Sequence, residues 1–237
     1  MDVYQLLIFQ LIAHILADFI FQSPKVAESK NENGFKSKYL YLHAFIVFLT
    51  SFILSFQWLF VIASISIALS HFLLDGFKQH ILQSKSMRSV WFFVDQILHL
   101  LIITAVVFLF NHYFYLKPII THGLSNHQLL IMLAYLLVLK PTNVVIKEIF
   151  NLYHISISIK DNEELLNAGK LIGNIERVLT LTLVLLNQYE IVGFIFAAKS
   201  ILRFKDSDTS RTEYVLIGTL LSFGIAILLG IGISLIK

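Results

Sequence analysis

Long apolar runs separated by short polar segments follow one another along this chain. A helix that crosses a bilayer needs about 20 mostly apolar residues, and runs of that kind recur here. A shorter run at 189–203 could be a further crossing or a thin re-entrant helix. We therefore expect an all-α, polytopic membrane bundle of seven or eight helices. The other runs cover residues 3–22, 39–56, 58–78, 89–111, 127–149, 171–187 and 212–236.

The composition also favours a lipid environment. Hydrophobic residues make up 57% of the chain and charged residues only 14%, whereas soluble domains carry about 25% charged residues. The absence of cysteine excludes a disulfide scaffold, and the many Phe, Ile and Leu residues exclude disorder. A net charge of +3 is too small to indicate a nucleic-acid partner. The start of the chain lacks a basic segment, so we interpret the 3–22 run as a retained helix rather than a signal peptide.

The positive charges lie on alternate loops. Thirteen of the eighteen Lys and Arg residues follow the 3–22, 58–78, 127–149 and 189–203 runs, against only Lys117 and Lys237 on the other side. The positive-inside rule then puts those loops in the cytoplasm and both termini outside. Pro141 is expected to kink or interrupt the 127–149 helix. We expect two membrane halves, 1–111 and 112–237.

Histidines and aspartates recur four residues apart inside three of these runs. Residues at that spacing lie on one face of a helix, about one turn from each other. Ionisable groups inside membrane helices are costly and usually functional, so each pair is a candidate site. The candidates are the pairs His14 and Asp18, His71 and Asp75, and Asp95 and His99, with His43 in addition.

These seven groups are expected at one depth. The 3–22 and 58–78 helices run inward and carry their pairs in their second halves, whereas the 39–56 and 89–111 helices run outward and carry theirs in the first. Four imidazoles and three carboxylates in the cytoplasmic half of the bilayer suit Zn²⁺, as one ion or a pair. Some of the seven would orient ligand imidazoles rather than bind the metal. A proton or ion relay and a structural hydrogen-bond network are the alternatives.

A second polar group comes from the C-terminal half. Glu176 lies near the start of the 171–187 run, and Lys199 and Arg203 lie four apart at the end of the 189–203 run, on the same cytoplasmic side. Two cations beside a metal centre would suit an anionic substrate group such as a phosphate or carboxylate. Alternatively, Glu176 neutralises Arg177 or Lys199, and Arg203 reaches the lipid headgroups.

These motifs resemble a known family. The run Ala-His-Ile-Leu-Ala-Asp-Phe-Ile-Phe-Gln at 13–22 is similar to the opening signature of the bacterial integral membrane family catalogued as domain of unknown function 3307. His43 and the motifs His71-x3-Asp75 and Asp95-Gln96-x2-His99 fall where that family carries its other polar helix positions, and the resemblance covers about residues 10–100. It implies a fold class and no activity. More distantly, the His-x3-Asp pattern is similar to membrane-bound metal-dependent hydrolases, over the motifs alone.

The leading hypothesis is a membrane enzyme with a metal centre. Bound Zn²⁺ lowers the pKa of its water toward ~7, and a carboxylate, Asp18 or Asp95, would take the proton. Lys199 and Arg203, with Glu176 beside them, would stabilise charge on the substrate. The reaction would be hydrolysis of a phosphoester or amide, in a lipid or a small molecule that reaches the inner leaflet.

Two other functions remain open. A proton- or metal-coupled transporter needs polar groups that continue toward the outer leaflet, and segments 62–68 and 100–110 offer little beyond Ser and Thr. A membrane anchor or partner-binding protein would use the 22–38 and 150–170 loops as docking surfaces.

Overall fold

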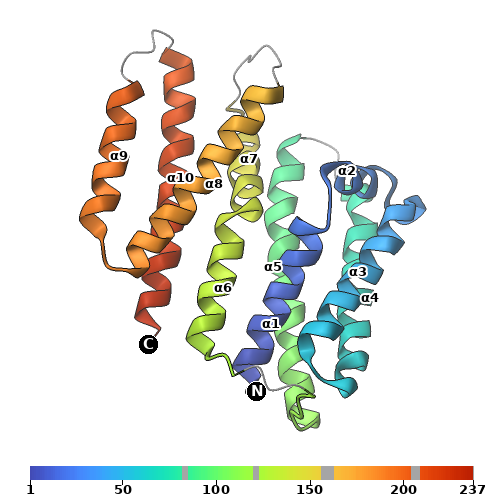
Figure 1. Cartoon of the computed structure of the whole chain (residues 1–237). Helices are drawn as coiled ribbons and strands as arrows, with labels where there is room; N and C mark the ends of the chain where they lie inside the picture. Colours follow the sequence, from blue (N-terminus) through green and yellow to red (C-terminus); the bar gives the residue numbers. More distant parts are fainter. Residues whose placement is uncertain (82–84, 120–122, 156–162, 204–208, 237) are drawn as a thin grey trace. The chain divides into compact units, whose positions relative to one another are not determined.

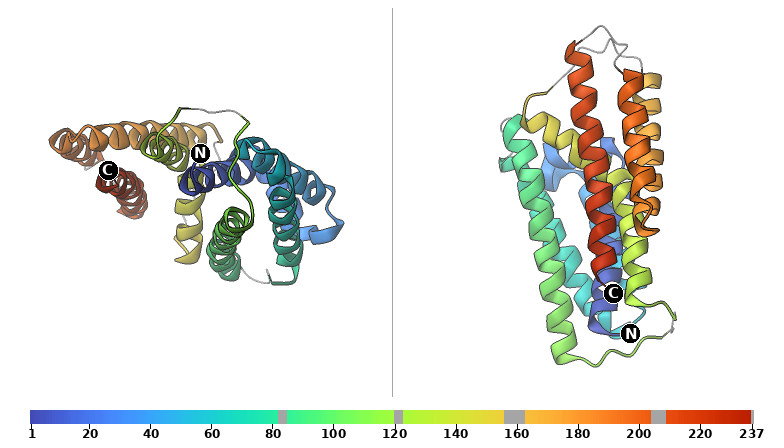
Figure 2. Two further views of the ribbon diagram at one scale, coloured as in Figure 1. Left: turned by 90° about the horizontal axis from the view of Figure 1, so that it is seen from below. Right: turned by 90° about the vertical axis from the view of Figure 1, so that its left-hand side faces the viewer.

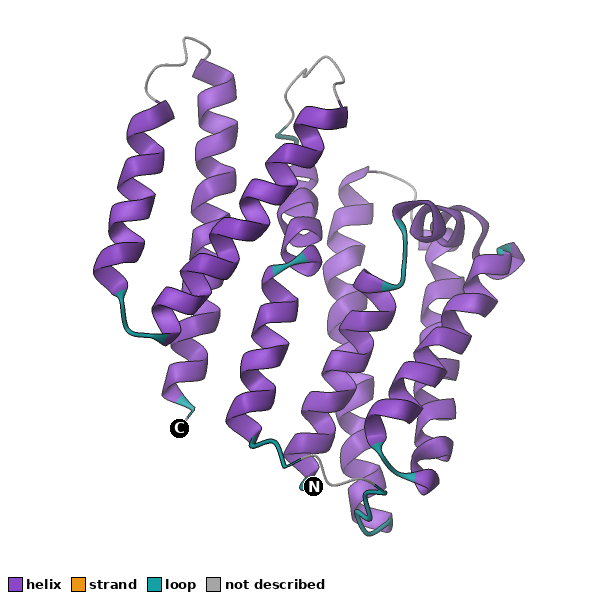
Figure 3. Ribbon diagram, viewed as in Figure 1, coloured by secondary structure: helices purple, strands orange, loops and turns teal. Residues whose placement is uncertain are grey.

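A computed structural model of the chain describes residues 1–81, 85–119, 123–155, 163–203 and 209–236. Every regular element in these residues is a helix (Figure 3). The prediction of an all-α fold is therefore confirmed. The chain divides into two compact units, Met1–Leu133 (unit 1) and Ala134–Lys237 (unit 2). The predicted functional halves, 1–111 and 112–237, stay a prediction.

Four long helices form a ring in unit 1. Contacts run from α1 to α3, from α3 to α4, from α4 to α5, and from α5 back to α1 (Figures 1 and 2). One face of each helix therefore points into a shared interior. The long helices are α1 (Val3–Ile15), α3 (Lys38–Ser55), α4 (Val61–Ile81) and α5 (Lys85–Tyr113), and the short elements are the π-helix η1 (Leu16–Ile20), α2 (Pro24–Asn33) and the 3-10 turns η2 (Gly34–Lys36) and η3 (Trp58–Phe60).

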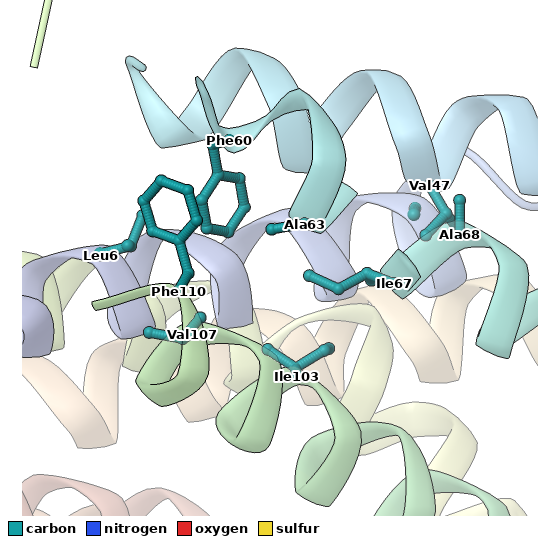
Figure 4. Packing of buried hydrophobic residues seen from close by; sticks show 10 residues of the cluster. Leu6, Val47, Phe60, Ala63, Ile67, Ala68, Ile103, Val107 and Phe110 are labelled. Atoms are coloured by element: carbon teal, nitrogen blue, oxygen red, sulfur yellow. The ribbon is translucent and has the colours of Figure 1, made fainter. Parts of the chain in front are cut away.

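The interior faces form an apolar core. Leu6, Ile67 and Val107 are buried in one cluster that draws on all four long helices (Figure 4). The rings of Phe60 and Phe110 pack edge to face in it, with centroids 4.9 Å apart. The same helix faces continue beyond the core. His71 lies one turn after Ile67 on α4, and His99 lies two turns before Val107 on α5. The apolar core thus brings polar positions of different helices to the same interior.

The 22–38 segment, expected to be a loop, contains the helix α2. The Ser23 hydroxyl accepts a hydrogen bond from the Val26 N–H, and Pro24 occupies the first helical position, where its missing N–H has no cost. α2 packs against α4. The turn that follows α2 fits α4 so closely that a Cβ on Gly76 would lie 2.2 Å from the Phe35 ring. Tight packing therefore seats α2 on the bundle.

Several helices are long and apolar enough to cross a membrane. In the described part of the chain five meet this criterion, and the bent pair α6–α7 would make a sixth. Their outward faces are apolar, since Ile62 is 58% and Leu101 61% exposed. These features suit a bilayer. The seven or eight crossings predicted from the sequence stay a prediction, and the five segments are Val3–Ile20, Lys38–Ser55, Trp58–Gln79, Met87–Tyr113 and Thr212–Leu235.

A helix that begins in unit 1 is broken within unit 2. The helices α6 (Asn126–Val138) and α7 (Lys140–Leu152) meet at an angle of 47°, with Leu139 between them. Pro141 stands in the first turn of α7 and cannot donate a backbone hydrogen bond. The predicted interruption is confirmed. The rest of unit 2 consists of α8 (Glu163–Leu185), α9 (Tyr189–Arg203) and α10 (Thr209–Leu235).

Arg177 of α8 fills the break. Its Nε donates to the Val138 carbonyl at 2.5 Å, at the open C-terminal end of α6. The two Nη atoms donate to Ser222 Oγ at 2.9 Å and to the side-chain oxygens of Asn143 and Asn174 at 2.6 Å each. The side chain is almost completely buried. Arg177 thus ties α6, α7 and α10 to α8.

We expect a small enlargement at the contact between α8 and α10 to destabilise unit 2. A Cβ added at Gly230 would lie 2.5 Å from Val184 Cγ1, so Gly230→Ala overpacks the contact and should cost about 1–3 kcal/mol of unfolding free energy. Gly232 is the matched control, because a Cβ there meets nothing within 4 Å. Gly232→Ala should be neutral or stabilise by up to about 1 kcal/mol. Denaturant unfolding in detergent micelles measures both, and equal effects would contradict the close helix approach.

Candidate metal centre

Three side chains from three helical segments place their donor atoms on a small triangle. His43 Nε2 of α3 lies 3.0 Å from His71 Nε2 of α4. Asp18 Oδ1, from the π-helix, lies 3.4 Å from His43 Nε2 and 3.2 Å from His71 Nε2. We call this the donor triangle. Asp75 Oδ2 lies farther from the same two nitrogens, at 3.6 Å and 3.7 Å.

These separations fit the coordination shell of a small divalent ion. A tetrahedral Zn²⁺ with bonds of about 2.0–2.1 Å holds its ligand atoms about 3.3–3.4 Å apart. The edges of the donor triangle lie close to that value, and the two edges to Asp75 are slightly longer. Two imidazoles and a carboxylate are also an established ligand set for a catalytic zinc ion. The clustered His and Asp side chains could therefore hold a metal ion.

The π-helix sets the position of Asp18. The Phe21 N–H donates to the Leu16 carbonyl five residues earlier, which widens this turn relative to an α-helix. Asp18 Oδ1 consequently reaches His43 and His71 on neighbouring helices while staying 3.7 Å from His14 Nδ1. Such π-turns are concentrated at functional sites. The i,i+4 spacing predicted the proximity of His14 and Asp18, but it did not predict the π-turn.

The remaining candidates surround the donor triangle. The His99 ring stacks on that of His71, with centroids 3.8 Å apart, and its Nδ1 lies 3.5 Å from Asp95 Oδ2. His14 Nε2 lies 3.3 Å from Gln96 Oε1, within hydrogen-bond distance. All seven residues predicted as ligands thus lie in one cluster. Three overlapping triads have ligand atoms within 4.8 Å of one another: His14, Asp18 and His71; His43, His71 and Asp75; and Asp75, Asp95 and His99.

Two lysines complete the cluster. Lys30 Nζ of α2 lies 2.5 Å from Asp75 Oδ2. Lys78 Nζ lies 2.5 Å from Asp75 Oδ1 and 2.7 Å from Asp95 Oδ2, and so bridges two carboxylates. Both lysines are among the thirteen cations that the positive-inside rule assigns to cytoplasmic loops. The helical spacing between Asp75 and Lys78 could have revealed the second, whereas Lys30 arrives on a helix that the pattern did not predict.

The charges of this cluster do not balance. Three carboxylates face two ammonium groups, all of them largely buried. With neutral histidines one negative charge remains, and a buried unbalanced charge is costly. A cation at the donor triangle would compensate it. Asp18 is the most exposed of the three carboxylates, with 9% of its side chain accessible.

The residues expected to contact a substrate lie in unit 2. Lys199 forms an ion pair with Glu176, and its Nζ lies 5.7 Å from the Phe223 ring centroid. The structure therefore shows the neutralising arrangement that was one of the two interpretations of Glu176. The side chain of Arg203 lies outside the described side chains. Sequence reasoning did not identify the buried position of Arg177.

Comparison with known proteins supports the family resemblance and no activity. Residues 6–121 match the model of a family described as "Protein of unknown function (DUF3307)". This range includes the donor triangle and all the surrounding candidates, and it ends before unit 2. No curated protein and no solved structure matches the chain.

Proposed function

We propose that this protein is a membrane-embedded, zinc-dependent hydrolase whose ion is held by His43, His71 and Asp18. The observation that carries the proposal is the donor triangle, with edges of 3.0, 3.2 and 3.4 Å. Catalytic zinc sites have three protein ligands and leave one position for water or substrate. Asp75 Oδ2 lies next to the donor triangle but is bonded to Lys30, so we leave it out of the ligand set; Lys78 contacts its other oxygen.

The chemistry follows from the ion and from Asp95. Zinc lowers the pKa of bound water to about 7, which supplies a nucleophile at neutral pH. Asp95 Oδ1 is buried and has no hydrogen-bond partner among the described residues. We assign to Asp95 the role of accepting the proton. Lys199, Arg203 and Glu176 stay candidates for contacts to the substrate.

Charge supports an anionic substrate. A divalent ion added to three carboxylates and two ammonium groups leaves one positive charge in a buried site. An anionic group would neutralise it. A phosphoester or a carboxylate-bearing amide, in a lipid or a small molecule, meets this requirement. The distribution of Lys and Arg supports a location of the site in the cytoplasmic half of the membrane, with both termini outside. The resemblance to a bacterial membrane family supports a bacterial inner membrane as the location.

We expect Asp95→Asn to separate metal binding from turnover. The variant keeps the donor triangle, so Zn²⁺ content should equal that of the wild type, while loss of the proton acceptor should lower hydrolysis about 10²–10⁴-fold. Release of p-nitrophenol from bis(p-nitrophenyl) phosphate by detergent-solubilised protein measures the rate. Glu32→Gln, which removes an exposed carboxylate on α2, is the control. A zinc-loaded wild type that cleaves neither this diester nor a p-nitroanilide would contradict the hydrolase.

One observation favours transport as a second candidate. Gln10 and Ser51 are buried: Gln10 Nε2 donates to the Ser51 carbonyl at 3.0 Å, and Ser51 Oγ donates to Gln10 Oε1 at 2.6 Å. Ser51 Oγ also lies 3.1 Å from Ser64 Oγ, within hydrogen-bond distance. Gln10 lies one turn before His14 on α1, so polar groups continue beyond the cluster on helices other than the 62–68 and 100–110 segments. Zinc uptake into proteoliposomes that is lost in Asp18→Asn would favour transport over hydrolysis.

A further inference from the structure

The third triad has the composition of a second metal site. Asp75, Asp95 and His99 place one donor atom each within 4.8 Å of one another. Both ring nitrogens of His99 are buried and have no hydrogen-bond partner among the described residues. Asp75 belongs both to this triad and to the group around the donor triangle. A carboxylate shared in this way is the arrangement of two-metal hydrolytic sites, in which the ions lie about 3.5–4 Å apart.

A lysine already occupies this position. Lys78 Nζ lies 2.5 Å from Asp75 Oδ1 and 2.7 Å from Asp95 Oδ2. A metal ion bound to the same two oxygens would have to lie about 2.0–2.2 Å from each. The ammonium group and the ion would therefore overlap. Lys30 does not compete in the same way, because it contacts only Asp75 Oδ2.

The charge of the cluster leads to the same conclusion. With one divalent ion, the three carboxylates and two lysines leave one positive charge, which one anionic ligand can neutralise. A second divalent ion would raise the excess to three positive charges in a buried site, where uncompensated charge is strongly unfavourable. The single positive charge of the Lys78 ammonium group leaves less excess charge in the cluster than a second divalent ion would.

We propose that Lys78 takes the place of a second metal ion, so that the centre binds one Zn²⁺ and uses the lysine ammonium as its second cation. This inference rests on the proposed zinc centre and fixes its stoichiometry. Lys78 positions Asp75 and Asp95 through its contacts with Asp75 Oδ1 and Asp95 Oδ2. It also excludes the ion that the triad of Asp75, Asp95 and His99 would otherwise bind.

Counting zinc in matched variants tests the proposal. Protein purified without metal-affinity resin is dialysed against buffered Zn²⁺ and analysed by mass spectrometry for zinc per chain. We expect one ion in the wild type and two in Lys78→Met, which removes the ammonium group and frees the triad while keeping an unbranched side chain. Lys78→Arg, which keeps the cation, should stay at one. The double variant Lys78→Met/Asp95→Asn, which lacks a ligand of the second site only, should return to one.

The outcomes separate this inference from the proposed function. Two ions in the wild type, or one ion in a monodisperse Lys78→Met, would overturn the inference and leave the zinc centre standing. No zinc in any variant would overturn the zinc centre and the inference with it. If Lys78→Met does not elute as a monodisperse species, Lys78→Gln replaces it, with the same expected count of two.

Discussion

Replacing His71 with alanine is expected to empty the metal centre. The His71 Nε2 atom lies close to three other donor atoms: 3.0 Å from His43 Nε2, 3.2 Å from Asp18 Oδ1 and 3.7 Å from Asp75 Oδ2. Its loss leaves two donors on the triangle, and we expect zinc affinity to fall by more than about 100-fold, the upper range for losing an outer-sphere partner alone. At a zinc concentration that just saturates the wild type, the variant should retain essentially none.

Two comparison variants distinguish a ligand from a neighbour. His14 lies outside the donor triangle, beside Asp18 and Gln96, so His14→Ala should weaken binding only about 10–100-fold. His112 lies at the exposed end of α5, and His112→Ala should change nothing. Equilibrium dialysis with zinc analysis measures all three. Wild-type zinc content in a folded His71→Ala would show that this triangle is not the binding site.

Removing Arg177 is expected to have the largest effect on the stability of unit 2. Arg177→Met leaves the Val138 carbonyl, Ser222 and two asparagine side chains without the guanidinium that they share. Hydrogen bonds from a charged donor contribute about 1.5–3 kcal/mol each in soluble proteins and less in membrane proteins. We expect a loss of about 2–4 kcal/mol in the free energy of unfolding.

Burying the guanidinium charge costs desolvation energy, which opposes the stabilisation from its hydrogen bonds. Asn143 and Asn174 keep their own hydrogen bond of 2.9 Å in the variant, which limits the loss. The Val138 carbonyl loses the hydrogen bond from Arg177 Nε at the break, where the next residue, Leu139, is not helical. Unfolding in sodium dodecyl sulfate, with Lys147→Met as the control for losing an exposed cation, measures the balance. Equal or greater stability in Arg177→Met would mean that the desolvation cost of the guanidinium exceeds its hydrogen bonds.

The sequence predicted the parts of the structure that depend on periodicity. Long apolar runs predicted the long helices. The spacing of four residues predicted that His71 lies beside Asp75 and that Asp95 lies beside His99. The positive-inside rule assigned the same membrane depth to groups on four different helices, and the structure brings those groups together. These features follow from local geometry or from a rule that acts on each loop separately.

The rest depends on contacts between segments distant in the sequence. Lys30 resembled any other loop lysine until α2 carried it to Asp75, which is 45 residues away. The amino-acid sequence around Asp18 contains no motif that predicts the π-turn, which directs Asp18 toward His43. The sequence suggested that Arg177 could form an ion pair with Glu176. Its guanidinium instead donates hydrogen bonds to side-chain amides, a hydroxyl and a backbone carbonyl. Such partners are set by packing, which a single sequence does not reveal.

The close fit of the turn after α2 against α4 links the assembly of this unit to the charge of its interior. The Phe35 ring leaves no room for even a methyl group on Gly76, and Lys30 on α2 is bonded to Asp75 within the cluster. Before α2 docks, the three carboxylates face a single ammonium group, that of Lys78, and docking brings the second. The net negative charge that the bundle must bury is therefore smaller once α2 has docked, so a segment outside the ring of helices lowers the cost of assembling it.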